Sequence, residues 1–147
     1  MNTSPPLRAL LGFVAAAISV IIFHQGMVAI LHTLNLPGMT VAAPFPMQPT
    51  KPFGVPLIAS LVFWGGLYGV VFGLLAPGMK GAMWVNGIIL GVVAALVGFF
   101  VVAPIKGNPI GGGFDVMVWA RSLLINGFFG LGVGILYPLL VPGRLRN

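Results

Sequence analysis

Four long apolar stretches dominate this chain of 147 residues and constrain its fold more than any other feature. They cover about residues 9–31, 55–75, 82–102 and 116–140, and each holds the roughly 20 mostly apolar residues that a membrane-crossing helix needs. Only 5% of the residues are charged, whereas about a quarter are charged in a typical soluble domain. We therefore predict an all-α membrane protein with four transmembrane helices in a compact bundle, forming a single domain over residues 1–147.

The segments between the spans predict how the chain crosses the membrane. Residues 76–81 form a short turn, whereas residues 32–54 and 103–115 are longer, rich in proline and glycine, and expected to be irregular loops on one side. The apolar stretch that begins near Ala9 continues to Leu31, which favours a retained helix over a cleaved signal peptide. Basic residues favour the other side, so both termini and the short turn are expected in the cytoplasm. The inner set is Arg8, Lys80, Arg144 and Arg146, and the outer set is Lys51, Lys106 and Arg121.

The ends of the second and fourth spans match in sequence. Residues 74–78 read Leu-Leu-Ala-Pro-Gly and residues 139–143 read Leu-Leu-Val-Pro-Gly. This pattern predicts a helical hairpin used twice in the same orientation, with chance similarity between glycine-rich helices as the alternative. The other matches in this alignment are Gly65 with Gly130, Gly69 with Gly134, and the aromatic Trp64 with Phe129, and a basic residue follows closely after both helix ends, Lys80 and Arg144.

Glycines recur at four-residue spacing in three of the spans. Such spacing leaves a smooth stripe along one helix face, where two backbones can approach closely in lipid. The stripes predict helix packing, either inside the chain or against a partner's helix. The glycines expected at these contacts are Gly65, Gly69, Gly73, Gly87, Gly91, Gly130 and Gly134.

Polar residues inside apolar spans are functional candidates, because placing them in lipid is costly. For His24 we predict either a hydrogen bond to Asn86, Asn126 or a backbone carbonyl, or contact with a haem or quinone. His32 follows eight residues later, about 12 Å along a helix, so the two rings cannot hold one metal ion or one haem. We therefore expect no metal site and no cofactor held by this chain alone, although a bound lipid fits the sequence. The polar candidates are His24, Gln25, Asn86, Arg121 and Asn126.

Three features near the start of the fourth span carry further predictions. Asp115 is placed to cap the helix at its N-terminus. Arg121 is expected either to reach lipid headgroups or to face inward and hold an anionic group such as a lipid phosphate. The run Gly111 to Gly113 lacks the Lys-Ser or Lys-Thr of a phosphate-binding loop, so we expect a flexible or re-entrant turn.

Composition excludes several classes of function. The chain has no cysteine and a single acid, Asp115, which excludes thiolate chemistry and mechanisms that need two carboxylates in one chain. The net charge of +6 comes from basic residues spread singly along the chain, which indicates contact with anionic headgroups rather than nucleic acid. Neither a nucleophile–base pair nor a set of metal ligands is visible, so we do not expect an enzyme.

One family resemblance is visible in the spans. Residues 64–73 read Trp-Gly-Gly-Leu-Tyr-Gly-Val-Val-Phe-Gly, Lys80 precedes a glycine, and residues 126–137 read Asn-Gly-Phe-Phe-Gly-Leu-Gly-Val-Gly-Ile-Leu-Tyr. Over about residues 60–138 this pattern resembles a group of small glycine-rich, four-helix bacterial inner-membrane proteins of uncharacterised function. The resemblance implies that fold and the bacterial inner membrane, but no activity. Those proteins often carry histidines near the places of Phe63 and Asn126, so the resemblance does not support a histidine-based role here.

Three functions remain open for such a chain. The first is an accessory or structural subunit of a larger inner-membrane complex, respiratory or photosynthetic, which packs through its glycine-rich helix faces and proline-rich outer loops. The second is a homo-oligomeric small transporter or channel with a path lined by His24, Asn86 and Asn126. The third is an electron-transfer subunit that contacts haem or quinone. The expected partners are membrane lipid and other membrane-protein subunits.

Overall fold

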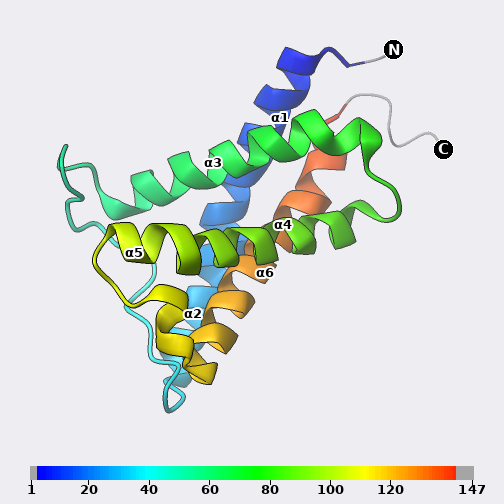
Figure 1. Cartoon of the computed structure of the whole chain (residues 1–147). Helices are drawn as coiled ribbons and strands as arrows, with labels where there is room; N and C mark the ends of the chain where they lie inside the picture. Colours follow the sequence, from blue (N-terminus) through cyan, green and yellow to red (C-terminus); the bar gives the residue numbers. More distant parts are fainter. Residues whose placement is uncertain (1–2, 142–147) are drawn as a thin grey trace.

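The computed structural model describes residues 3–141, and within them the chain is helical apart from its connecting segments (Figure 1). Four helical stretches, Pro5–Leu34, Leu57–Gly78, Met83–Ile105 and Val116–Leu140, are long and apolar enough to cross a membrane. This confirms the predicted all-α chain with four helices of that kind. Arg144 and Arg146, used above for orientation, and the matching residues 142–143 lie outside the described residues.

The stretches are assembled from shorter helical segments. The first joins α1 (Pro5–Ser19), the π-helical η1 (Val20–His24) and α2 (Gln25–Leu34). The second joins α3 (Leu57–Leu75) and the 3₁₀ turn η2 (Ala76–Gly78). The third joins α4 (Met83–Val97), the π-helical η3 (Gly98–Val102) and α5 (Ala103–Ile105). The short turn η4 (Ile110–Phe114) then leads into α6 (Val116–Leu140).

Local sequence explains where several helices begin and end. Pro5 opens α1, where its missing N–H costs no helical hydrogen bond. Asn35 ends α2 in the left-handed conformation, with a φ of 43°. The Oδ1 atom of Asp115 accepts hydrogen bonds from the backbone N–H groups of Met117 at 2.8 Å and Val118 at 3.0 Å. Asp115 is therefore the N-cap of α6, as predicted.

The turn before α6 is left-handed over three successive glycines. Gly111, Gly112 and Gly113 have φ values of 62°, 59° and 67° and ψ values of 21°, 29° and 15°. Side chains with a Cβ rarely adopt this conformation, so a run of three requires glycine. The indole Nε1 of Trp119 donates a hydrogen bond to the Gly111 carbonyl at 2.8 Å. The glycine run thus has a defined turn that α6 itself holds in place.

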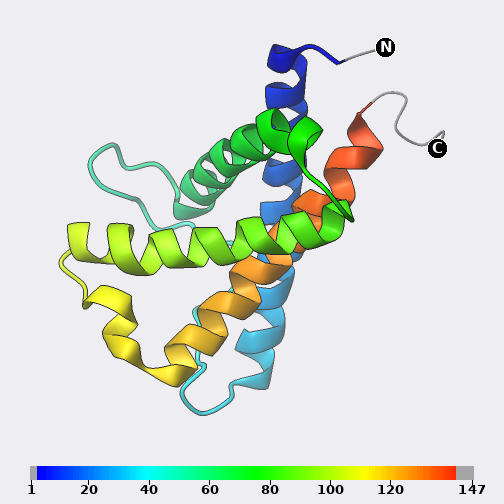
Figure 2. The ribbon, with the colours of Figure 1, turned by 45° about the vertical axis from the view of Figure 1, so that its right-hand side comes forward.

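The helices pack as two pairs that meet along one seam. α1 packs on α3, α4 packs on α6, and α1 also packs along α6. Figures 1 and 2 show α3 and α4 crossing the α1–α6 pair, while the start of α1 and the end of α6 lie at the same end of the molecule. α3 and α4 make few contacts with each other. The two pairs are therefore joined chiefly through the first and last helices.

Reciprocal glycine contacts hold each pair together. A Cβ placed on Gly12 would run into the carbonyl oxygen of Gly69, and a Cβ on Gly69 would run into that of Gly12. Gly87 and Gly130 meet in the same reciprocal way between α4 and α6. Only glycine permits backbones this close, where dispersion contacts are dense. One turn along from these pairs, the equivalent contacts are Gly73 with the Arg8 carbonyl and Gly134 with the Met83 carbonyl.

The glycine contacts of the two helix pairs repeat in a different register from the matching sequences at the helix ends. By contact, Gly69 of the first pair corresponds to Gly130 of the second. Alignment of the matching helix ends instead equates Gly69 with Gly134, which is one helical turn further along. Pro-Gly sequences fix where a helix ends, whereas small residues fix where two helices cross, so the two registers are set independently.

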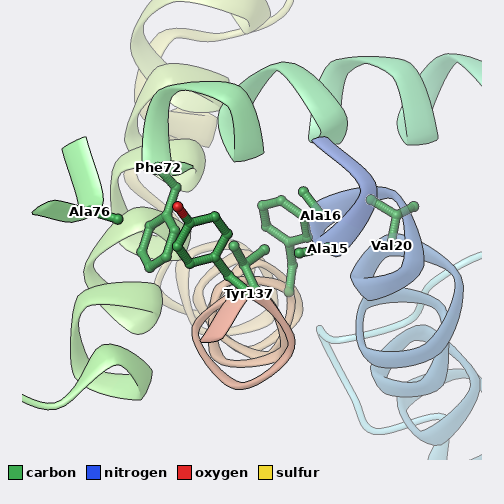
Figure 3. Packing of buried hydrophobic residues seen from close by; sticks show 8 residues of the cluster. Ala15, Ala16, Val20, Phe72, Ala76 and Tyr137 are labelled. Carbon is green, nitrogen blue, oxygen red and sulfur yellow. The ribbon is translucent and has the colours of Figure 1, made fainter. Parts of the chain in front are cut away.

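The seam between the pairs is a core of buried side chains (Figure 3), and hydrogen bonds of Tyr137 and Ser19 cross it. Phe72 and Tyr137 meet edge to face with ring centroids 5.6 Å apart, and the Tyr137 hydroxyl donates to the Gly73 carbonyl at 3.2 Å. The Ser19 hydroxyl donates to the Phe129 carbonyl at 2.6 Å. These contacts tie α6 to both α1 and α3. The buried members of this core are Ala15, Ala16, Val20, Phe72, Ala76, Phe129, Val133 and Tyr137.

Candidate functional site

A cavity of about 550 Å³ lies between α3 and α4, with η1 and α6 as its floor. It exists because α3 and α4 cross the α1–α6 pair without packing closely on each other. Its walls are mainly apolar and aromatic, and they include Trp64 from α3, Ala94 from α4 and Phe129 from α6. The volume lies within the range of small-molecule sites in proteins, roughly 300–1,000 Å³.

Both π-helical segments line this cavity. Val20 and His24 come from η1, and Gly98 and Val102 come from η3. A π-helical turn inserts one extra residue into an α-helix and redirects the side chains on one face, and such turns occur frequently at functional sites. A Cβ on Gly98 would have no atom within 4 Å. The glycine therefore adds open volume to the cavity instead of close helix packing.

A chain of hydrogen bonds fixes the chemical state of the His24 ring. The backbone N–H of Phe45 donates to Oε1 of Gln25 at 2.6 Å, and this contact sets the orientation of the buried Gln25 amide. The Nε2 group of that amide then faces Nδ1 of His24 at 3.1 Å. Because an amide nitrogen only donates, Nδ1 must accept, and a neutral imidazole then carries its proton on Nε2. His24 thus has an Nε2–H donor left for the cavity that it lines.

Four further polar side chains line the cavity. The amide nitrogen of Asn126 donates to the Ser122 carbonyl at 2.9 Å, which leaves the amide oxygen without a hydrogen bond within residues 3–141. The hydroxyl groups of Ser60 and Tyr68 and the ammonium group of Lys106 also have no hydrogen-bond partner among the described residues. The cavity therefore combines an apolar wall with several unused hydrogen-bonding groups.

Within residues 3–141, His24 makes none of the hydrogen bonds predicted for it to Asn86, Asn126 or a backbone carbonyl, because the neighbouring Gln25 amide takes the ring's Nδ1 instead. Asn126 lines the same cavity as His24. Asn86 does not, since its amide donates to the carbonyls of Lys80 at 3.0 Å and Ala82 at 3.2 Å, at the start of α4. The described chain thus brings together two of the three polar residues proposed for a transport path.

Arg121 and His32 both bind the segment between α2 and α3. The guanidinium group of Arg121 donates to the Thr40 carbonyl at 2.7 Å. The Nδ1 atom of His32 lies 2.9 Å from the carbonyl of Val41. Arg121 thus uses one of its donors to hold a loop, and its contact with lipid headgroups or with an anionic group stays a prediction.

All seven glycines singled out from the sequence lie at helix contacts within the chain. Gly65 faces Val20 and Phe129, and Gly91 faces the Asn126 carbonyl. The other five take part in the contacts described for the two helix pairs. The stripes are thus used internally, which leaves no need for a partner's helix at these positions.

Several parts of the cavity were not predicted from sequence. The sequence does not identify Trp64 and Tyr68 as cavity residues, since an aromatic residue in an apolar span has no signature that separates packing from ligand contact. The π-helical turns have no residue pattern of their own. A signal that could have pointed to the site is the adjacent pair His24 and Gln25, two polar residues in an otherwise apolar stretch.

Comparisons with known proteins give no relative. A scan against protein-family models found no match, and searches of curated proteins and of solved structures found nothing similar to this chain. The functional argument therefore rests on the geometry of this chain alone.

Proposed function

We propose that this chain is an accessory subunit of a larger inner-membrane complex of the respiratory or photosynthetic kind. Its four long apolar helices support insertion in the membrane. The distribution of basic residues supports an orientation with both termini and the short 76–81 turn in the cytoplasm. The reciprocal glycine contact in each helix pair supports a helical hairpin used twice, in a register one helical turn away from that of the sequence match.

The observation that carries the proposal is an apolar surface outside the spans, here called the outer apolar surface. Contact with lipid accounts for exposed apolar side chains along the candidate spans, whereas the side chains of this surface belong to segments outside those spans. Phe53, which lies in the 35–56 segment, is 88% exposed. Apolar patches of this kind on ordered segments mark interaction sites. The name covers the exposed apolar side chains of the two connecting segments, which are Phe45, Met47 and Phe53 of the 35–56 segment and Ile110 and Phe114 of η4.

Hydrogen bonds hold the backbone beneath this surface in place. Gln25 binds the N–H of Phe45, and Arg121 binds the carbonyl of Thr40. The Thr50 N–H also donates to the Val55 carbonyl at 2.8 Å, which closes the turn that presents Phe53. A surface ordered before binding loses less conformational entropy on docking. We infer that the partner is another membrane protein whose outer-side segments present apolar side chains.

Stoichiometric co-purification from native membranes tests this function. Tagged protein is extracted in mild detergent, and the peak is analysed by mass spectrometry and absorption spectroscopy. We expect larger membrane subunits in a fixed ratio. The double variant Met47→Ser, Phe53→Ser should reduce their recovery by about tenfold, because it removes two anchors of the outer apolar surface.

The matched control is Gln48→Ser, an exposed polar residue in the same segment, which should leave recovery unchanged. A colourless homo-oligomer without other subunits would contradict the accessory function and would favour the transporter. Full recovery of partners with the double variant would show that docking uses a different surface.

A further inference from the structure

We propose that the cavity between α3 and α4 binds a lipid-soluble quinone, that is, a flat carbonyl-bearing ring on an apolar tail. The inference goes beyond the docking function, because the site is built from this chain alone and needs no partner. Its volume of about 550 Å³ suits a ring with the first part of its tail.

The polar side chains that line the cavity favour a ligand whose ring accepts hydrogen bonds. His24 offers its Nε2–H group, and Ser60 and Tyr68 offer hydroxyl groups. The chain's single acid, Asp115, is bound to the start of α6 and is not part of the cavity wall. Because the cavity wall offers hydrogen-bond donors but no carboxylate, it favours a neutral carbonyl compound over a cation. A quinone carries two carbonyl oxygens on opposite sides of its ring and can use more than one of these donors.

Ser60 and Lys106 line the cavity close to helix ends, but the depth of His24 and Asn126 argues against a lipid headgroup as the occupant. His24 lies ten residues before the end of α2 at Leu34, and Asn126 lies ten residues after the start of α6 at Val116. At 1.5 Å per residue each lies about 15 Å from the outer end of its helical stretch. A phospholipid head remains at the membrane interface, and its acyl chains need no hydrogen bonds. The deep polar groups instead match a polar ring that is soluble in lipid.

The aromatic side chains in the cavity wall suit the quinone ring, and the gap between α3 and α4 suits its tail. Trp64, Tyr68 and Phe129 provide flat faces for ring contacts, which are most favourable in offset-stacked or edge-to-face geometry. Because α3 and α4 barely touch, the tail can leave between them towards the surrounding lipid. Leu57 and Ile105 line the outer end of the same space.

Quinone binding by the full chain in lipid nanodiscs tests the proposal. The nanodiscs contain phosphatidylethanolamine and phosphatidylglycerol, the probes are decylubiquinone and a short-tailed naphthoquinone, and the readout is quenching of tryptophan fluorescence. We expect saturable binding of one quinone per chain. His24→Phe removes the Nε2–H donor at similar volume and should weaken binding by about tenfold or more.

A pair of glycine variants separates occupation of the cavity from folding. Gly98 lines the cavity and Gly127 does not, yet a Cβ at either position would meet no atom within 4 Å. Gly98→Leu should therefore fill the cavity and abolish saturable binding, whereas Gly127→Leu and His32→Phe should leave it unchanged.

The absence of saturable binding of both probes would overturn the proposal, as would equal binding by the Gly98 and Gly127 variants. Native mass spectrometry could instead find a phospholipid bound to the wild-type chain and lost only in the Gly98→Leu variant. That result would overturn the quinone proposal and identify a phospholipid as the occupant of the cavity. Failure of co-purification would leave this test unaffected, because it uses the isolated chain.

Discussion

Replacing Gly69 with leucine should strongly destabilise the folded state of this chain. A Cβ at this position would overlap the carbonyl oxygen of Gly12 and the side chain of Ala16. Overpacking a core costs typically 1–3 kcal/mol when side chains can move aside. Here the obstacle is the backbone of α1, which cannot rotate away without moving the whole helix. We therefore expect the upper end of that range or more, about 3 kcal/mol.

The measurement is the fraction of monodisperse protein in a fluorescence-detected size-exclusion profile after extraction in mild detergent. Gly130→Leu should fail in the same way, since Gly130 makes the equivalent contact with Gly87. Gly127→Leu is the matched control, because it makes the same helix-favouring change in α6 at a position with open space. A well-folded Gly69→Leu variant would mean that α1 and α3 do not approach as closely as described.

Replacing Gln25 with leucine should release the outer segment from the helices. Gln25 is 1% exposed and accepts the N–H of Phe45, so the variant leaves that N–H without its partner. A buried donor left unpaired costs about 1–3 kcal/mol. The same change removes the contact that fixes the His24 tautomer, so quinone binding should weaken as well.

Hydrogen–deuterium exchange of peptides from the 35–56 segment measures this release. A cost of 1–3 kcal/mol corresponds to faster exchange of the Phe45 amide by about five- to 150-fold. Gln48→Leu alters an exposed glutamine in the same segment and should leave exchange unchanged. Unaltered exchange in the Gln25 variant would show that other contacts order the segment.

The helices could be predicted because a lipid-spanning stretch is visible in composition alone. Their ends were less accurate, since hydropathy measures apolar length and not helical backbone. The first helical stretch extends back to Pro5 and forward to Leu34, and Thr33 lies in it with its hydroxyl bound to the Ala29 carbonyl at 2.8 Å. The Asp115 cap was predictable because capping depends on a local residue type.

The cavity could not be predicted, since it depends on how helices cross. The sequence shows which glycines allow close approach, but it does not show which helix each one meets. The link from Phe45 through Gln25 to His24 joins residues that are distant in the chain, and no periodicity encodes it. The two π-helical turns that aim residues into the cavity likewise lack a residue signature.

The pairing of helices has a consequence for the order of events during synthesis. Once α1 and α3 have emerged from the ribosome, they can join through Gly12 and Gly69. α4 emerges next, and its glycine face stays unmatched until α6 follows. α6 then completes the second pair and closes the seam with Phe129 and Tyr137 in a single step. Nascent chains halted before α6 should therefore hold one finished hairpin and one helix open to chaperones and quality-control proteases.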